Sequence, residues 1–326
     1  MKRLAITMGD PGGIGPEIIV KALSCTSSRD CFSIVVIGDR VPLEEALRLL
    51  KAPAKLRVIK SPGESNLTTL GRAIELIDLN MIKKFKKGKP TAEGGRTSVS
   101  YIKKAVDLIF KKQVDAIITA PISKESWKIG GFEWPGHTEL LAELTYTKDY
   151  AMMLIGGPLK VILVTIHTPL KKIPTLITED RILKTIRLTK KACYMLGIKR
   201  PRIAVAGLNP HAGEAGLFGD EEIREIIPSI KKAKREGIPV SGPYPPDSVF
   251  HKAYMGEFDI IVCMYHDQGL IPLKMVAFNE GVNVTVGLPF IRTSPDHGTA
   301  YDIAWKGIAN PSSMIEAIKL SARLRL

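Results

Sequence analysis

The sequence has little cysteine and no long apolar run, and both absences narrow what the protein can be. Its four cysteines, at positions 25, 31, 193 and 263, include no CxxC pair. That argues against a zinc ribbon or a disulfide framework and favours reduced thiols acting as small apolar side chains. No uncharged apolar stretch approaches the ~18 residues of a membrane span. The apolar part of the N-terminal MKRLAITMGDPGG is too short for a signal peptide, so we expect a cytoplasmic protein.

Acidic residues are also in deficit, with 33 Asp and Glu against 47 Lys and Arg and a net charge of +14. Such an excess is compatible with nucleic-acid binding, but the densest basic run, IKKFKKGK (82–89), contains one aromatic residue, whereas single-strand binders interleave several. We therefore favour solvated helix faces, with some steering of anionic substrates, and expect neither a nucleic acid nor a membrane as partner. A nucleic-acid-binding protein remains a distant alternative.

What the sequence does contain is a regular alternation of short β-branched runs and longer amphipathic segments. The expected strands are 4–8, 32–38, 115–120, 160–166, 202–208, 259–265 and 283–288, and the clearest helices are 98–113, 179–196 and 221–236. Strands that are apolar on both faces and alternate with helices predict an α/β fold with mainly parallel sheets. The 326 residues suffice for about two domains, and the lack of a Pro/Gly-rich linker indicates that the domains exchange segments.

Three of the expected strands are followed by a histidine. These are His167, His211 and His266. Ligands bind at the carboxyl edge of open α/β sheets, so the imidazoles would converge there if the strands are neighbours. Three neutral imidazoles leave a position open on a divalent metal, and Asp267 supplies the carboxylate often found behind a ligand histidine. The alternative is that each histidine caps its own strand end.

Anion-binding groups are the second feature. His137 and Thr138 open the helical pattern TELLAEL, where free N–H groups and a hydroxyl can hold phosphate; a simple helix cap is the alternative. Lys274, Asn283 and Arg292 surround the strand NVTVGL, although a lone Lys or Arg is usually a surface charge. The loop GDPGGIGPE (9–17) has neither Rossmann nor Walker spacing, so backbone packing is its expected role.

Seven motifs, in order along nearly the whole chain, together resemble the 4-hydroxythreonine-4-phosphate dehydrogenase family of pyridoxal phosphate biosynthesis. They are GDPGGIGPE (9–17), APISKE (120–125), PGHTE (135–139), LNPHAGE (208–214), GPYPPDSVF (242–250), YHDQGLIPLK (265–274) and RTSPDHGTAYDIAWKG (292–307). Gly12 departs from the alanine that the family often has in its first motif.

The resemblance implies an NAD- or NADP-dependent oxidation of 4-phosphooxy-L-threonine to a β-keto acid, which loses CO2 to give 3-amino-2-oxopropyl phosphate. It implies a divalent metal (zinc, cobalt, magnesium or manganese) on the three histidines named above. His137, Thr138, Lys274, Asn283 and Arg292 would hold the substrate. It further implies a homodimer whose active site is shared between chains.

The resemblance also implies a fold. We expect two α/β/α domains like those of isocitrate and isopropylmalate dehydrogenases, with a cleft between them. One domain would comprise 1–128 with 290–326, and the other, with the metal ligands and dimer interface, 129–289.

The loop 297–311 is similar to the adenine-side loop of those dehydrogenases, with Tyr301 and Trp305 in place of the usual Pro and Gly. We therefore expect His297, Gly298, Thr299 and Ala300 to contact the cofactor.

Two questions stay open in the sequence. The general base is not identified; Asp247, Asp267 and Lys274 lie within the motifs and are candidates. A paralogous dehydrogenase acting on 4-phosphoerythronate or 4-phosphothreonate would need the same bound metal, phosphate-binding groups and hydride transfer. No residue discriminates between these substrates.

Overall fold

The computed structural model describes residues 2–25, 32–64 and 73–326, and the chain forms two compact units. Unit 1 comprises Met1–Thr147 with Leu288–Arg323, and unit 2 comprises Lys148–Gly287 with Leu324–Leu326. The first domain was expected to end at residue 128, but its first segment continues to Thr147. The boundary falls later because the segment up to α5 (His137–Leu144) packs on unit 1, where the rings of Trp134 and His137 meet Trp127 edge-on at 6.3 and 6.0 Å.

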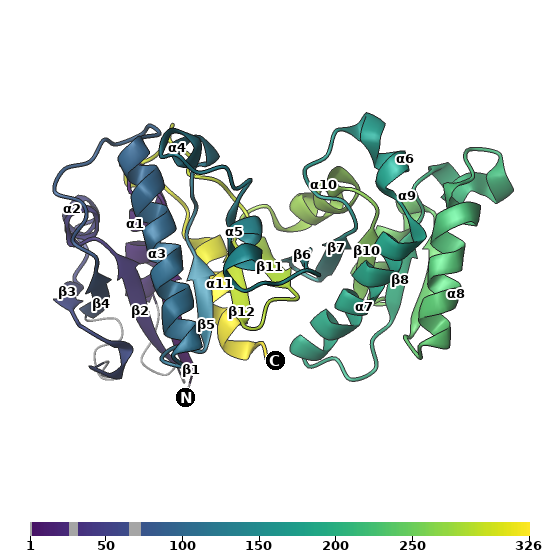
Figure 1. The fold of residues 1–326 in the computed structure, drawn as a ribbon, viewed down its shortest axis with the longest axis horizontal. Coiled ribbons are helices and arrows are strands. Elements are labelled where there is room, and N and C mark those ends of the chain that lie inside the picture. Colours follow the sequence, from purple (N-terminus) through teal and green to yellow (C-terminus); the bar gives the residue numbers. More distant parts are fainter. Residues whose placement is uncertain (1, 26–31, 65–72) are drawn as a thin grey trace. The chain divides into compact units, whose positions relative to one another are not determined.

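Unit 1 is a parallel sheet flanked by helices (Figure 1). Its elements are β1 (Lys2–Thr7), α1 (Gly15–Cys25), β2 (Phe32–Gly38), α2 (Arg40–Leu49), β3 (Lys55–Val58), a 3₁₀ turn at Pro62–Glu64, β4 (Ala73–Asp78), α3 (Ala92–Phe110), β5 (Ala116–Thr119), α4 (Lys124–Ile129), α5 (His137–Leu144), β12 (Ile291–Pro295) and α11 (Ser312–Arg323). The strand order is β3-β4-β2-β1-β5-β12, and the described pairs within it are parallel.

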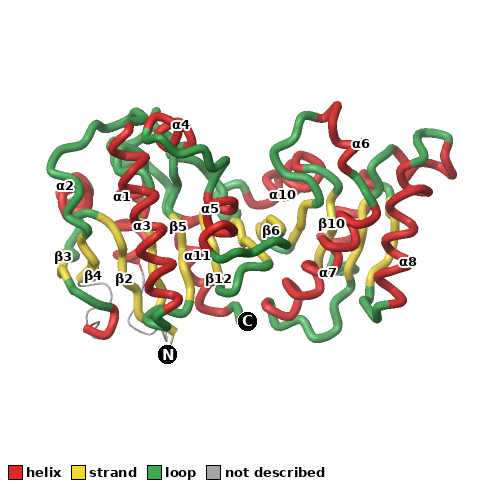
Figure 2. The backbone as a smooth tube through the Cα atoms, viewed as in Figure 1, coloured by secondary structure: helices red, strands yellow, loops and turns green. Residues whose placement is uncertain are grey.

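Unit 2 has a mixed sheet in the order β11-β6-β7-β10-β8-β9. Its elements are β6 (Ala151–Gly156), β7 (Leu159–Leu163), a 3₁₀ turn at Leu170–Lys172, α6 (Ile173–Leu176), α7 (Glu179–Met195), β8 (Ile203–Ala206), a turn segment at Pro210–Gly216, a π-helical turn at Glu222–Ile226, α8 (Ile227–Arg235), β9 (Val240–Tyr244), α9 (Pro246–Tyr254), β10 (Ile260–Cys263), α10 (His266–Ala277) and β11 (Val282–Val286). The pairs β11–β6 and β6–β7 are antiparallel, and the others are parallel. Figure 2 shows the same elements as helix, strand and loop.

Local sequence explains the main elements. All seven residues of β2, FSIVVIG, are buried, as expected of a central strand covered on both faces. Helix α7 begins after Thr178, whose hydroxyl accepts the N–H of Arg181, and carries Glu179 and Asp180 in its first turn, the capping and charge pattern typical of a helix start. The predicted α/β class with mainly parallel strands is confirmed.

The cysteines in the described part of the chain are thiols; Cys193 and Cys263 are buried and Cys25 is exposed. Burial raises the pKa of the Cys193 thiol to about 12, which keeps it protonated and unreactive at neutral pH. Cys31 lies outside the described residues. No helix in those same ranges is long and apolar enough to cross a membrane.

Candidate active site

The three strands that precede the predicted metal ligands are neighbours in unit 2. β10 lies between β7 and β8 and pairs with both in parallel. His167 follows β7, His266 is the first residue of α10 directly after β10, and His211 lies in the turn segment after β8. The condition set by the sequence, that these strands be adjacent, is therefore met, and their carboxyl ends share one edge of the sheet (Figure 1).

Two of the imidazoles are paired. The ring centroids of His167 and His266 are 5.4 Å apart, with the planes tilted by 41°. Nδ1 of His266 lies 2.7 Å from Oδ1 of Asp267, a contact that orients the ring and leaves Nε2 for a ligand. Neutral imidazoles backed by a carboxylate suit zinc or cobalt. The two imidazoles and the carboxylate are therefore of the donor type that a divalent metal would accept.

His211 is held in an unusual backbone. The five residues from His211 to Ala215 all have positive φ, between 43° and 83°, and only Gly213 among them is a glycine. Each non-glycine residue in this left-handed region costs roughly 1–2 kcal/mol, and such strain clusters at functional sites. The His211 ring lies 6.1 Å from that of Phe218. Within the described ranges, no three His, Cys, Asp or Glu side chains are grouped as a complete metal site.

The predicted phosphate-binding residues His137 and Thr138 lie in unit 1, where α5 begins at His137. Gly136 precedes the helix and offers no side-chain cap, and Thr138 is buried. Nε2 of His137 is buried and has no hydrogen-bond partner in the part of the chain that the structure describes. Burial, with the nearby charge of Arg292, holds the pKa of His137 well below its usual value. The ring is therefore neutral and offers a buried polar atom to a ligand.

Arg292, on β12, is the cation of this site. Its side chain is 2% exposed, and its Nη2 and Nε donate to Oγ1 of Thr119 at 2.7 and 3.2 Å. Burial lowers its pKa to about 9, against the opposing effect of Glu139. The guanidinium still carries its charge at neutral pH. A buried cation beside a neutral imidazole and a helix start is a suitable anion site.

The remaining predicted substrate groups belong to unit 2. Lys274 is on α10, its Nζ 5.7 Å from the ring centroid of Phe278, and Asn283 is on β11 opposite Leu154. Asp247 is exposed in the first turn of α9. Among the candidate bases, Asp267 is the one whose carboxylate contacts His266.

The predicted cofactor loop, His297–Ala300, follows β12 and is fixed from behind by the N-terminal loop. The N–H of Ile14 donates to the carbonyl of Thr299 at 3.0 Å. A Cβ on Gly13 would come within 2.9 Å of Thr299, so only glycine permits this approach. His297 Nδ1 lies 3.1 Å from the Gly298 carbonyl. The backbone-packing role expected for GDPGGIGPE is thereby confirmed.

Tyr301 and Trp305, the two substituted positions near that loop, form hydrogen bonds with buried carboxylates. Tyr301 donates its hydroxyl to Asp10 at 2.9 Å, and burial raises the pKa of Asp10. The backbone N–H groups of Trp305 and Gly307 donate to Glu17, which is fully buried. Sequence reasoning missed both carboxylates, because their partners lie almost the whole chain away.

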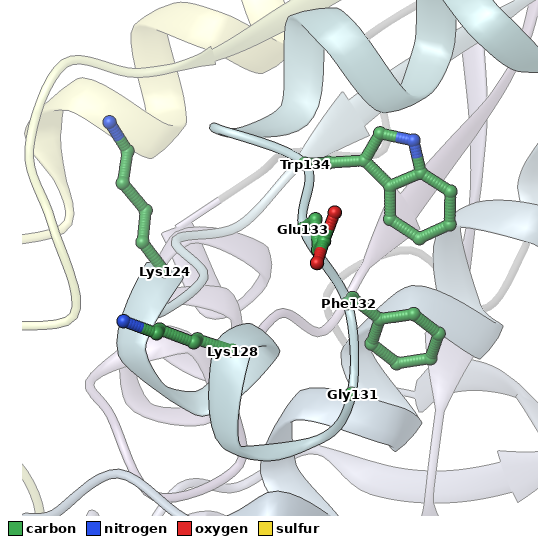
Figure 3. A pocket seen from close by; sticks show the side chains of 6 residues that line it. All are labelled: Lys124, Lys128, Gly131, Phe132, Glu133 and Trp134. Atoms are coloured by element: carbon green, nitrogen blue, oxygen red, sulfur yellow. The ribbon is translucent and has the colours of Figure 1, made fainter.

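A pocket of about 530 Å³ in unit 1 was also not predicted (Figure 3). It is lined by Lys124, Lys128, Gly131, Phe132, Glu133 and Trp134. Lys124 and Lys128, on α4, extend to one side, and the rings of Phe132 and Trp134 lie on the other. Those rings are stacked, with centroids 5.4 Å apart.

Comparison with known proteins gives a consistent result. The family model described as "Pyridoxal phosphate biosynthetic protein PdxA" matches residues 30–321. A 4-hydroxythreonine-4-phosphate dehydrogenase of Desulforapulum autotrophicum is 47% identical, covering 98% of this chain and 94% of its own. A D-threonate 4-phosphate dehydrogenase of Salmonella typhimurium is also 47% identical, covering 99% of both chains. The crystal structure of 4-hydroxythreonine-4-phosphate dehydrogenase from Klebsiella pneumoniae superposes with a TM-score of 0.89 at 45% identity, covering 99% of this chain and 98% of that one.

Proposed function

The chain belongs to the PdxA family of pyridoxal phosphate biosynthetic proteins and is an oxidoreductase, and from this premise we propose its reaction. It oxidises the secondary alcohol of 4-phosphooxy-L-threonine with NAD or NADP. The resulting β-keto acid loses CO2 and leaves 3-amino-2-oxopropyl phosphate. The hydride passes to the nicotinamide and the hydroxyl proton is released, so the oxidation is balanced by reduction of the cofactor.

The observation that carries the proposal is the nearness of the buried Arg292 charge to His137 in unit 1. Arg292 brings a positive charge, and Nε2 of His137, which has no hydrogen-bond partner among the described residues, can bind a polar ligand. A substrate phosphate would accept from the guanidinium and from the free N–H groups at the start of α5, with the Thr138 hydroxyl beside it. Lys274 and Asn283 hold the rest of the substrate. Binding energy at the phosphate would then orient the carbon that reacts.

His167, His211 and His266 hold the metal in this proposal. A divalent ion bound there would supply Lewis acidity toward the alcohol oxygen and the ketone derived from it. Asp267 orients the His266 ring through the 2.7 Å contact, which leaves Lys274, on the same helix, and Asp247 as candidates for moving the substrate proton. Nitrogen ligands favour zinc or cobalt over magnesium or manganese.

The cofactor contacts the loop His297–Ala300 in this account. Two features of unit 1 suit it. The loop backbone is immobilised by the bond from Ile14 to Thr299, and the neighbouring helix α4 carries Lys124 and Lys128, whose ammonium groups suit the phosphates of a dinucleotide. Ser126 of the same helix lies 3.1 Å from the hydroxyl of Tyr301, which links helix and loop.

A comparison of three substrates tests the reaction. The protein is given 4-phosphooxy-L-threonine, 4-phosphoerythronate or 4-phosphothreonate with NAD or NADP, and reduction of the cofactor is followed by absorbance. We expect the first substrate to have the highest kcat/KM. A higher value for either of the others would assign the chain to the paralogous activity, a candidate kept because a D-threonate 4-phosphate dehydrogenase is as similar to this chain as the 4-hydroxythreonine-4-phosphate enzyme is.

We further propose that the active unit is a cytoplasmic homodimer with a shared site. One chain pairs His167 with His266, and His211 of a second copy would complete the ligand set. Mixing His211→Ala and His266→Ala chains tests this, because a heterodimer would then contain one intact set of ligands. Recovery of activity after subunit exchange is the expected result. No recovery, with exchange confirmed by mass, would mean that each site is built within one chain.

A further inference from the structure

Buried polar groups tie together the strand ends that carry the three histidines. The first is Thr165, which is 1% exposed and lies two residues before His167. Its hydroxyl donates to the carbonyl of Met264 at 2.7 Å, and its N–H donates to the same carbonyl at 3.2 Å. Both bonds lie beyond the last paired residues of β7 and β10. The segment leading to His167 is thus fixed to the segment leading to His266.

The second group is the side chain of Gln268, two residues after His266 and 7% exposed. Its Oε1 accepts the N–H of Met264 at 2.7 Å, and its Nε2 donates to the carbonyl of Gly207 at 2.7 Å. Gly207 directly follows β8 and leads toward His211. One amide therefore bridges the ends of β10 and β8, because it presents an acceptor to one and a donor to the other.

The third group, Glu222, bonds the backbone that leads to His211. It is 1% exposed, and its Oε1 accepts the N–H groups of Leu208 and Asn209 at 2.7 and 2.8 Å. Its Oε2 accepts Nδ2 of Asn209 at 2.9 Å. A Cβ on Gly213 would come within 2.8 Å of that oxygen. The left-handed run that contains His211 is therefore built around one buried carboxylate.

We infer that Gln268 and Glu222 are positioning residues for the metal ligands, with Gln268 fixing the strand end that leads to His266 and Glu222 setting the conformation of the His211 segment. This inference rests on the proposed metal site. Neither residue needs to touch the metal. Each forms hydrogen bonds with backbone groups at the sheet edge that would otherwise lack these partners. These bonds fix the backbone from which the imidazole side chains extend.

The test is the affinity of the dimer for Co²⁺, measured by competition with a chelating dye and by the visible absorption of bound cobalt, which reports ligand geometry. Gln268→Met keeps the size of the side chain and removes both hydrogen bonds. We expect Co²⁺ binding to weaken about 10–100-fold, the usual effect of losing a partner that orients a ligand, with an altered spectrum. Thr189→Val is the matched control, because it deletes a buried hydroxyl bond within α7 that is remote from the strand ends.

A purely structural role predicts a different outcome. Gln268→Met and Thr189→Val would then both lower the Tm while the folded protein kept wild-type Co²⁺ affinity and spectrum, and that result would overturn the inference. If Gln268→Met does not fold, Gln268→Leu decides, because it also removes both hydrogen bonds but with a shorter apolar side chain. Wild-type affinity in a folded Gln268→Leu variant would also overturn it.

Glu222 has its own control in the adjacent Glu221, which accepts Nδ2 of Asn209 at 2.7 Å but neither backbone N–H group. Glu222→Gln is expected to weaken Co²⁺ binding about 10-fold or more, and Glu221→Gln to leave it nearly unchanged. Equal effects would contradict the role given to Glu222. Wild-type protein that binds no Co²⁺, or His266→Ala protein that binds it normally, would overturn the proposed metal site itself; normal His-dependent binding with unaffected Gln268 and Glu222 variants would overturn only this inference.

Discussion

The two units build their candidate sites in different ways. In unit 1 the groups are buried: Arg292 keeps its charge inside the protein, and the neutral His137 has a buried nitrogen that no described residue bonds. In unit 2 the groups stand at strand ends, with the side chain of His266 32% exposed, and the buried residues are the ones behind them. A site that recognises a fixed anion gains from burial, because charge-assisted bonds strengthen away from water. A site that binds a metal needs exposed nitrogens and a rigid support.

The largest expected effect comes from removing a histidine of unit 2. His266→Ala, and likewise His167→Ala or His211→Ala, should lower kcat by about 10³-fold or more, since Lewis acidity contributes several kcal/mol to the barrier. Metal analysis of the purified variants checks the cause, and the circular dichroism spectrum checks that the fold is kept. Full metal occupancy in all three variants would contradict the assignment.

Removing the buried cation of unit 1 should have the next largest effect. Arg292→Gln is expected to raise the free energy of substrate binding by about 2–5 kcal/mol, the cost of losing one partner of a buried charge pair. Metal content should stay at the wild-type level. Arg202→Gln is the control, because Arg202 is a cation 57% exposed that pairs with Asp259 in unit 2. An Arg292 variant that binds phosphorylated substrate normally would disprove the anion site.

The hydroxyl of Thr138 should contribute less than the charge. Thr138→Val keeps the shape and should weaken phosphorylated substrate by about 1.5–3 kcal/mol, while the non-phosphorylated alcohol is little affected. Thr145→Val removes a hydroxyl that bonds Leu141 at the far end of the same helix and should change neither substrate. If Thr138→Val weakens both substrates equally, Thr138 shapes the site and does not contact phosphate.

The smallest effect is a pH dependence of stability in unit 1. The pKa of His137 is lowered in the folded protein, so the unfolded chain binds the extra proton first as pH falls. The folded state should lose stability as pH drops through the unfolded value of about 6.5. His137→Asn lacks this group, so its Tm should fall less between pH 7.5 and 5.5 than that of the wild type. Parallel losses would show that His137 titrates normally.

The sequence predicted the strands of unit 2 well, but it did not predict the hydrogen bonds that hold the histidine-bearing segments in place. The apolar runs located the three strands that precede the histidines, whereas their adjacency was a condition that only the structure meets. The contact of Asp267 with His266 follows from their being neighbours in the sequence. The bonds from Gln268 to Met264 and Gly207 could not be predicted, because they depend on where two chain segments meet in space. The left-handed backbone at His211 gave no signal either, since four of its five residues are not glycine.

Prediction from the sequence has the same limit in unit 1. The motif that opens at His137 indicated an anion site, but a sequence does not reveal that Arg292 is buried or that Nε2 of His137 lacks a partner in the described part of the chain. The predicted boundary at residue 128 differs from the observed one because the aromatic contacts of Trp127 with Trp134 and His137 hold the intervening segment on unit 1. Tyr301 and Trp305, unexpected in their loop, bond to Asp10 and Glu17 from the first motif.

Equilibrium binding to two variants tests whether unit 1 binds the substrate phosphate and unit 2 binds the metal. Phosphorylated substrate and Co²⁺ are titrated separately into Arg292→Gln and His266→Ala protein by calorimetry. We expect Arg292→Gln to bind Co²⁺ like the wild type but to lose most of its affinity for the substrate, whereas His266→Ala loses Co²⁺ and still binds the phosphorylated substrate in the absence of metal. Loss of both ligands by each variant, or an exchange of the two losses, would contradict the assignment of phosphate to unit 1 and metal to unit 2.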